Sequence, residues 1–152
     1  MRLHLGCGPD ILPGWVNVDI CPDLGPSVNV WDLEEFPWPF DDGSADEIRG
    51  FDIIEHIHGR LVPGFLAECH RILAPGAALR LRTTYWQWKD SYTDPTHMWH
   101  PTEQSFDYWI DDGNALFKTQ NVQYGGFTFI KDKVEPNPET GQMDVILVKP
   151  DA

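Results

Sequence analysis

The sequence predicts an α/β fold with a mainly parallel sheet that ends in an antiparallel hairpin. Three observations predict it: apolar strand segments that end in glycine or a carboxylate, one amphipathic helix between two such segments, and two strand-like segments near the C-terminus. Because 152 residues match the usual size of one domain, we expect a single domain over residues 1–152.

The first two predicted strands end in groups that suit a ligand. Arg2-Leu3-His4-Leu5 breaks into Gly6-Cys7-Gly8, and the next apolar run, Trp15-Val16-Asn17-Val18, ends at Asp19. Glycine lacks the Cβ that would keep a ligand away from the backbone, and a carboxylate at the end of the neighbouring strand can accept hydrogen bonds from two ribose hydroxyls. The pair predicts a nucleoside-binding crevice at the strand ends.

Two further strands follow. Val28-Asn29-Val30-Trp31 predicts a short third strand that ends at Asp32, and Ala45 to Ile54 predicts a fourth that ends at Glu55-His56. The prolines between Phe36 and Ser44 exclude a regular helix there.

The crossover helices before the fourth strand are expected to be short or absent. Only Pro9 to Gly14 separates the first two strands, whereas a parallel crossover usually needs about a dozen residues or more. One sheet face is therefore expected to be covered only by aromatic side chains, which are Trp15, Trp31, Phe36, Trp38 and Phe40. We expect the part of this apolar face that stays exposed to be buried in a homodimer.

The strongest helical pattern runs from Val62 to Leu73. Its apolar residues recur at three- and four-residue spacing, Pro63 lies near the first turn, and Ala74-Pro75-Gly76 ends it. Ala77 to Thr84 then alternates as a strand, so helix and strand form one β-α-β unit of a parallel sheet.

The C-terminal part carries weaker patterns. Thr102 to Ile110 has a short helical pattern, and Val122 to Ile130 and Met143 to Val148 read as strands joined by a polar loop with Pro136, Pro138 and Gly141. These two strands predict a C-terminal antiparallel hairpin.

Composition excludes several classes of partner. The formal net charge of −13 and the sequence pI of about 4.6 argue against nucleic acid or an anionic membrane surface as a partner. The cysteines, Cys7, Cys21 and Cys69, have neither disulfide nor zinc-site spacing, which fits a reducing cytoplasm. No stretch approaches the roughly 20 apolar residues needed to cross a bilayer. We expect a cytoplasmic protein.

Several motifs together resemble the class I S-adenosylmethionine-dependent methyltransferases, in particular the short type 11-like group of bacterial and phage proteins. Leu3-His4-Leu5-Gly6-Cys7-Gly8 and Leu12-Pro13-Gly14-Trp15-Val16-Asn17-Val18-Asp19 look like the first two motifs of that group. Phe40-Asp41-Asp42-Gly43-Ser44-Ala45-Asp46-Glu47-Ile48 and Ile54-Glu55-His56-Ile57 look like its fourth-strand region. Glu68-Cys69-His70-Arg71-Ile72-Leu73-Ala74-Pro75-Gly76-Ala77 looks like its signature before the fifth strand. The resemblance extends to about Phe106.

The resemblance implies a Rossmann-like sheet and S-adenosylmethionine as cofactor, with S-adenosylhomocysteine as product. It implies that Gly6, Cys7 and Gly8 line the methionine end of the cofactor, that Asp19 takes the ribose hydroxyls, and that Ile20 also belongs to the cofactor site. The adenine would face Asp32 and Leu33, and Phe51, within Gly50 to Ile53, would lie in the wall between cofactor and acceptor. The chain departs from the pattern at Asp10, which replaces a third glycine, and at His4, which replaces an acidic residue.

Methyl transfer needs an in-line nucleophile and, for some acceptors, a base. Candidate bases are His56 and His97, with Asp94 as the carboxylate of Asp94-Pro95-Thr96-His97. The alternatives are a capping or packing role for His56 and a loop clamp for Asp94 and His97. His56, His58, His97 and His100 follow no fixed ligand spacing, so no metal site is predicted.

An acceptor with a sugar ring or another flat, partly apolar group would suit the aromatic set after the fifth strand, which also reads as a satellite core. The set is Tyr85, Trp86, Trp88, Tyr92, Trp99, Phe106, Tyr108 and Trp109. We therefore expect methyl transfer to a small-molecule or sugar-like acceptor. The alternatives are a non-catalytic S-adenosylmethionine-binding or partner-stabilising module and, less favoured because the third glycine is missing, a dinucleotide oxidoreductase.

Overall fold

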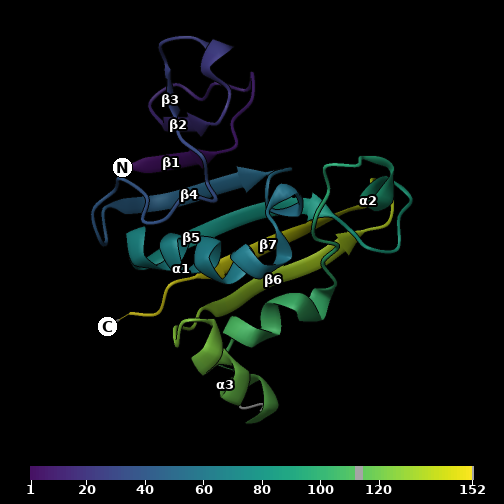
Figure 1. Cartoon of the computed structure of the whole chain (residues 1–152). Helices are drawn as coiled ribbons and strands as arrows, with labels where there is room; N and C mark the ends of the chain where they lie inside the picture. Colours follow the sequence, from purple (N-terminus) through teal and green to yellow (C-terminus); the bar gives the residue numbers. More distant parts are fainter. Residues whose placement is uncertain (112–114, 152) are drawn as a thin grey trace.

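The computed structural model describes residues 1–111 and 115–151, which form one seven-stranded sheet of order β3-β2-β1-β4-β5-β7-β6 (Figure 1). The parallel strands are β1 (Arg2–Leu5), β2 (Val16–Asp19), β3 (Val28–Val30), β4 (Ala45–Phe51) and β5 (Leu73–Thr84). The antiparallel hairpin is β6 (Ile130–Asn137) and β7 (Gln142–Val148), with β7 against β5. The mainly parallel sheet with a C-terminal hairpin is confirmed.

The helices are short apart from one. They are α1 (Val62–Ile72), α2 (Asp90–Thr93) and α3 (Ala115–Asn121), with 3₁₀ turns η1 (Pro22–Leu24), η2 (Ile54–His56), η3 (Gly59–Leu61), η4 (Glu103–Trp109) and η5 (Val122–Tyr124). The predicted helix before β5 is confirmed, although β5 begins at Leu73, earlier than expected. Within the described parts of the chain, no helix combines the length and apolarity that crossing a membrane requires.

The predicted strand from Val122 to Ile130 is wrong. Val122–Tyr124 forms the 3₁₀ turn η5, and β6 begins only at Ile130. Gly125 and Gly126 adopt φ values of 113° and 69°, which interrupt an extended chain. The hairpin therefore starts later than predicted, and Pro136 lies inside β6, which is tolerated because β6 is an edge strand.

The turn between β1 and β2 replaces the usual crossover helix, as predicted. The buried Asn17 side chain holds this turn: its Oδ1 accepts the Leu12 N–H at 3.0 Å, and its Nδ2 donates to the carbonyls of Leu12 at 3.1 Å and Trp15 at 3.2 Å. One amide side chain thus supplies hydrogen bonds to backbone groups that a helix would have paired internally.

One face of the sheet is the apolar core. Its strand side chains have relative exposures of 0–1% and are Leu3, Leu5, Ile48, Leu79, Leu81, Val145 and Leu147. They form one cluster with Phe65 and Leu66 of α1, which lies across this face in Figure 1. Each such side chain contributes about 1.5–3 kcal/mol by leaving water.

The opposite face of the sheet carries charged side chains in place of helices. Arg80 is exposed, and Arg49 and Arg82 are partly buried. The guanidinium carbons of Arg49 and Arg82 lie 4.1 and 4.6 Å from the centre of the Phe51 ring. Arg80 pairs with Glu47 at 2.9 Å. Over β4 and β5 this face is therefore charged, and the expectation of a bare apolar face is wrong there. Over β1 the predicted Trp15 does cover it, since its ring lies against His4 and 5.0 Å from the guanidinium carbon of Arg2.

The aromatic loop before β4 packs largely on the helical side. Trp38 is 2% exposed, and its ring centre lies 5.3 Å from that of Phe65 in α1. Phe36 lies against Gly64, where an added Cβ would come within 2.6 Å of the Phe36 ring. Phe36 and Trp38 thus cover α1, not the opposite face. The homodimer stays a prediction.

Candidate functional site

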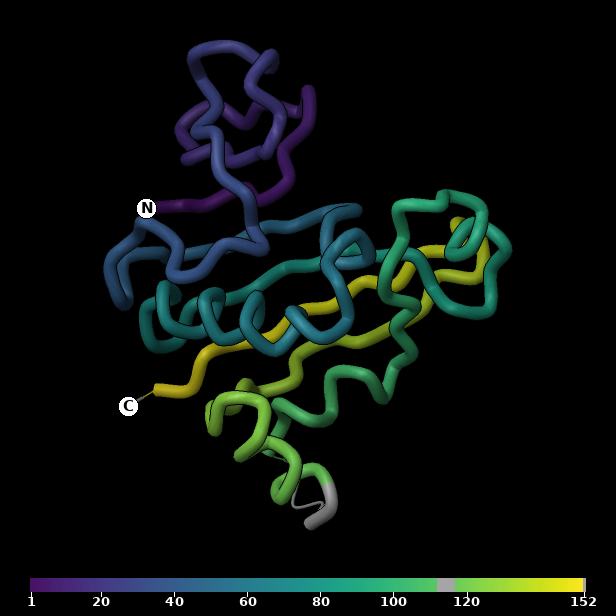
Figure 2. The backbone as a smooth tube through the Cα atoms, viewed as in Figure 1, coloured from purple at the N-terminus to yellow at the C-terminus, as the bar shows by residue number. Residues whose placement is uncertain are grey.

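The loops that carry the candidate site lie at one end of the sheet. Figure 2 shows both chain termini at the left-hand end and the teal segment that contains α2 at the right-hand end, toward which the arrows of β4 and β5 point in Figure 1. Polar groups from several strands meet at such an edge, because parallel strands end on the same side. The candidate site is built there from two adjoining parts.

The first part is a cavity of about 210 Å³, here called the strand-end cavity. It is lined by Gly6, Asp19, Ile20, Trp31, Asp32, Leu33, Glu34, Ile53, His56 and Ile57. Five residues predicted for cofactor binding line it, namely Gly6, Asp19, Ile20, Asp32 and Leu33. Its volume lies below the roughly 300–1,000 Å³ of typical ligand pockets, so it can enclose only part of a nucleoside-sized ligand.

The other predicted cofactor residues lie outside this lining. Cys7 is 3% exposed and donates its N–H to the Val18 carbonyl at 3.0 Å. Gly8 donates its N–H to Asp19 Oδ2 at 2.8 Å. Phe51 lies on the opposite face of the sheet between two arginines, because successive side chains of a strand point to opposite faces.

The Asp19 carboxylate is oriented by the backbone and still has acceptor capacity. Oδ2 accepts the Gly8 N–H at 2.8 Å, and Oδ1 accepts the Cys21 N–H at 2.9 Å. Because each carboxylate oxygen has two lone pairs, each keeps one site for another donor. Asp32 is held in a similar way, since its Oδ1 accepts the Glu34 N–H at 2.9 Å.

The two glycines after β1 have different roles. Gly6 adopts a φ of 58°, and a Cβ on it would lie 2.6 Å from the Ile53 side chain, which forms a wall of the strand-end cavity. Gly8 adopts a φ of 49°, and no atom lies within 4 Å of the place where its Cβ would be. Gly6 therefore permits packing, whereas Gly8 leaves open space where a ligand can approach the backbone.

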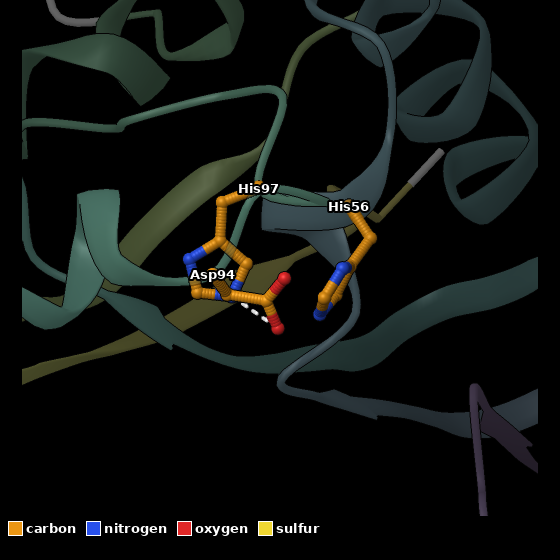
Figure 3. A group of neighbouring side chains, drawn as sticks. All are labelled: His56, Asp94 and His97. Atoms are coloured by element: carbon orange, nitrogen blue, oxygen red, sulfur yellow. Dashed lines mark ion pairs between the residues drawn. The ribbon is translucent and has the colours of Figure 1, made fainter.

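The second part is the His56–Asp94–His97 cluster, drawn in Figure 3. His56 comes from η2 after β4, and Asp94 and His97 come from the loop after α2. One nitrogen or oxygen atom of each side chain lies within 4.8 Å of those of the other two. Asp94 Oδ2 lies 4.0 Å from His97 Nε2, and the two imidazole centres are 4.7 Å apart.

The hydrogen bonds around the cluster fix the protons of both imidazoles. The Thr96 hydroxyl donates to Asp94 Oδ1 at 2.7 Å, so at its 3.0 Å contact with His56 Nδ1 the same hydroxyl must accept. His97 Nδ1 lies 3.1 Å from the carbonyl oxygen of Ser91, which can only accept. Both rings therefore carry a proton on Nδ1, and the neutral rings have a lone pair on Nε2.

The charge of Asp94 is stabilised locally. Hydrogen bonds from the Thr96 hydroxyl and from the Thr96 backbone N–H hold the pKa of Asp94 below its usual value. Asp94 is therefore a carboxylate at neutral pH, and its Oδ2 faces His97.

Glu55 anchors the loop that carries the cluster and was missed from the sequence. Its backbone carbonyl accepts the N–H groups of Met98 at 2.7 Å and Trp99 at 3.1 Å. Its side chain is 1% exposed, and burial raises the pKa of its carboxyl group. No motif marks this role, because it depends on a backbone carbonyl that any residue has.

The other two candidate histidines lie apart from the cluster. His58 Nδ1 pairs with Glu34 Oε1 at 2.8 Å. His100 Nδ1 lies 2.9 Å from the Ser91 hydroxyl, and its ring stacks on Tyr92 at 4.3 Å. Of the four histidines considered from the sequence, only His56 and His97 therefore lie together, and the Asp94 carboxylate lies beside them.

The aromatic set divides among several places. A cavity of about 570 Å³, here called the aromatic cavity, is lined by Gly59, Arg60, Val62, Pro63, Trp99, Ser105, Tyr108, Trp109, Gln123 and Tyr124. Tyr85 and Trp88 line another cavity, Phe106 is fully buried, and Trp86 and Tyr92 are exposed. Part of the set thus forms a recess and part belongs to the core.

Comparison with known proteins gives a fold relationship. No protein-family model matches the sequence, and no curated protein matches it. A SAM-dependent methyltransferase from Methanosarcina mazei is 16% identical, with 99% of this chain and 92% of that chain covered and a TM-score of 0.65. A chain in the complex of the Haloferax volcanii Trm112 methyltransferase activator is 14% identical, with 98% and 82% covered and a TM-score of 0.66.

The same architecture also occurs outside methyl transfer. The cyclase SpnF is 10% identical, with 99% of this chain and 74% of that chain covered and a TM-score of 0.70. At these identities the similarity extends to the fold. The chain therefore has the Rossmann-like fold of the class I SAM-dependent methyltransferases.

Proposed function

We propose that the protein binds S-adenosylmethionine in the strand-end cavity and transfers its methyl group to a small-molecule or sugar-like acceptor. The observation that carries this proposal is the position of His56, which belongs to both the cavity lining and the His56–Asp94–His97 cluster. A bound cofactor and a proton-accepting group would therefore share one wall. The methyltransferase fold supports the same assignment.

The residues of the cavity fit the cofactor. The free lone pairs of Asp19 suit two ribose hydroxyls, and Asp32 with the apolar Ile20 and Leu33 suits an adenine ring. The open space at Gly8 leaves room for the methionine part outside the small enclosed volume. The carboxylates favour a cationic ligand. When bound, S-adenosylmethionine supplies an electrophilic methyl group on a sulfonium.

The cluster suits an acceptor that must lose a proton. The Nε2 lone pair of His97 or His56 can take the proton of an acceptor hydroxyl while that oxygen attacks the methyl carbon. Asp94 stabilises the imidazolium that forms. Acid–base assistance of this kind contributes about 10²–10⁴-fold in rate.

The aromatic cavity supports a ring-shaped acceptor. Trp99 lies two positions after His97, so one loop carries both a wall of this cavity and a member of the cluster. The partly exposed rings of Trp99 and Tyr108 suit the apolar side of a sugar ring, and Arg60 and Ser105 can bind its hydroxyls.

Calorimetric titration with S-adenosylmethionine and S-adenosylhomocysteine tests the proposal. We expect both ligands to bind the wild type. Asp19→Ala should weaken binding at least about 100-fold, because it removes two hydrogen bonds to a charged acceptor. Asp23→Ala, which removes an exposed carboxylate from the following turn, is the matched control and should bind as the wild type does. No binding by the wild type, or equal losses in both variants, would contradict the proposal.

A second candidate is a non-catalytic binding or partner-dependent module. The small enclosed volume favours it, and one chain of similar fold belongs to a complex with a methyltransferase activator. Cofactor binding without turnover on a panel of hydroxylated acceptors, or turnover only with a second chain, would favour this candidate. If a panel of sugars leaves the tryptophan fluorescence of the protein unchanged in the presence of S-adenosylhomocysteine, a carbohydrate acceptor is excluded.

A further inference from the structure

The His56–Asp94–His97 cluster brings acceptors together without a donor among them. With both rings neutral, each imidazole offers a lone pair at Nε2, because Nδ1 holds the proton in both rings. Asp94 Oδ2 adds a negative charge 4.0 Å from His97 Nε2. Three acceptors at such separations are stabilised by a cation between them, either a proton on one Nε2 or a metal ion.

We propose that Nε2 of His56, Nε2 of His97 and Oδ2 of Asp94 bind one divalent transition-metal ion of the zinc type. Two imidazole nitrogens and one carboxylate oxygen are ligands that Zn²⁺ binds in proteins, and three protein ligands leave a position for a further molecule. Figure 3 shows the two rings on either side of the Asp94 carboxylate. The ligand set joins a turn after β4 to a loop after β5.

The distances allow the site to close with small movements. Bonds of about 2.0–2.2 Å place tetrahedral ligands roughly 3.3 Å apart. Asp94 Oδ2 lies 4.0 Å from His97 Nε2, and no two ligand atoms of the cluster are more than 4.8 Å apart. Each ligand atom therefore has to move by only about 1 Å to reach a bound ion. The Asp94 side chain is 48% exposed, so it can turn toward the ion without disturbing the core.

Outer hydrogen bonds of the kind that accompany metal ligands are already present. A ligating histidine usually donates its other N–H to a carbonyl or a polar oxygen, which fixes its orientation. His97 makes this bond to the Ser91 carbonyl and His56 to the Thr96 hydroxyl. Thr96 also holds Asp94 Oδ1, which leaves Oδ2 for the ion. A simple loop clamp accounts for the Thr96 bonds but not for the approach of ligand atoms from two histidines and one carboxylate to within 4.8 Å of one another.

The role of the ion in the reaction rests on the proposed function, whereas its binding does not. An acceptor hydroxyl in the open coordination position would lose its proton more easily, because a bound cation lowers the pKa of an oxygen ligand. The proton would pass to solvent, and the acceptor oxygen would use its electron pair to bond the methyl carbon. The carbon–sulfur bond would break, and its electron pair would stay on the sulfur, which gives S-adenosylhomocysteine. The histidines then act as ligands, and the proton-accepting role given to them above passes to water.

Metal titration of tag-free protein, freed of metal with a chelator that is then removed, tests the site. We expect Zn²⁺ to bind at a 1:1 ratio by calorimetry, and Co²⁺ to give visible absorption bands that Zn²⁺ displaces. His97→Ala should weaken binding at least about 100-fold, and Asp94→Ala, at an exposed position, should do so without affecting folding. His58→Ala is the matched control. The His58 imidazole also pairs with a carboxylate, that of Glu34, but His58 does not belong to the cluster of three side chains, so its loss should leave metal binding unchanged.

The titration needs no cofactor, so its failure is distinct from failure of the methyl-transfer proposal. Absence of saturable binding by the wild type would overturn the site. Equal affinities of wild type, His97→Ala and Asp94→Ala would also overturn it, because the metal would then bind elsewhere. A 1:1 site lost in both variants and retained in His58→Ala supports it, whether or not S-adenosylhomocysteine binds.

Discussion

The strand-end cavity and the His56–Asp94–His97 cluster adjoin at His56 but are built in different ways. In the cavity, Gly6 follows β1 and Asp19 is the last residue of β2. The register pairs Leu5 with Val18, so backbone pairing sets the separation of Gly6 and Asp19. In the cluster, His56 and Asp94 come from segments joined by the loop contacts of the Glu55 carbonyl. The first site depends on the sheet and the second on a loop.

This difference predicts that the two sites respond separately to substitution. Substitutions of Gly6 and Gly8 should alter both the free energy of unfolding and the affinity for the cofactor, because the backbone after β1 packs against the fold and also borders the strand-end cavity. Changes in the cluster should alter chemistry and metal binding while the sheet and the cofactor affinity persist.

The largest effect is expected for His97→Ala. Turnover should fall about 10²–10⁴-fold, since the variant removes either a proton acceptor or a metal ligand, and the affinity for S-adenosylhomocysteine should stay within about twofold of wild type. Single-turnover methyl transfer and calorimetry measure the two quantities. If His97→Ala loses cofactor affinity as Asp19→Ala does, the two sites are not separable.

Gly6→Ala should destabilise the fold by about 2–4 kcal/mol, since a left-handed backbone and an overpacked contact with Ile53 add together. Gly8→Ala has the same backbone strain but open space, so it should cost only about 1–2 kcal/mol while still weakening cofactor binding. Urea unfolding of both variants gives the comparison. Equal losses of stability would mean that Ile53 does not pack on Gly6.

Glu55→Gln tests the anchor between the two sites. Burial raises the folded-state pKa of Glu55 above the unfolded value of 4.5, so its contribution to stability is greatest below 4.5 and is lost as pH rises through the folded pKa. Glutamine removes this loss, and its amide can keep an interaction with the neighbouring Thr83 hydroxyl. We expect the variant to be about 1 kcal/mol more stable than wild type at neutral pH.

The pH dependence is the control for Glu55. The advantage of Glu55→Gln should shrink as pH falls toward 4.5 and should disappear below this unfolded pKa, where the wild-type carboxyl is protonated in both states. A constant difference across this range, measured by denaturant unfolding, would show that charge burial is not the cause.

The smallest effect is expected for Phe51→Ala. Phe51 lies on the polar face of the sheet between Arg49 and Arg82, away from the strand-end cavity, so cofactor affinity should change by no more than about twofold. A loss of cofactor affinity comparable with that of Asp19→Ala, measured by the same calorimetry, would show that Phe51 belongs to the cofactor site.

What the sequence could predict follows from the same difference. Glycines after one strand and a carboxylate after the next are adjacent in any parallel sheet, so Gly6 and Asp19 could be placed together from spacing alone. The face of Phe51 could not, because it depends on the register within β4. The approach of Asp94 to His56 depends on tertiary hydrogen bonds of Thr96 and Glu55, which leave no periodic signal.

A backbone ¹H–¹⁵N NMR titration with S-adenosylhomocysteine tests the central proposal most directly, because it reports where the ligand binds. The account predicts saturable shifts in the amides of Gly6, Gly8, Ile20 and Leu33, at and beside the strand-end cavity. Shifts confined to the aromatic cavity, or no shifts at ligand excess, would contradict a cofactor site at the strand ends.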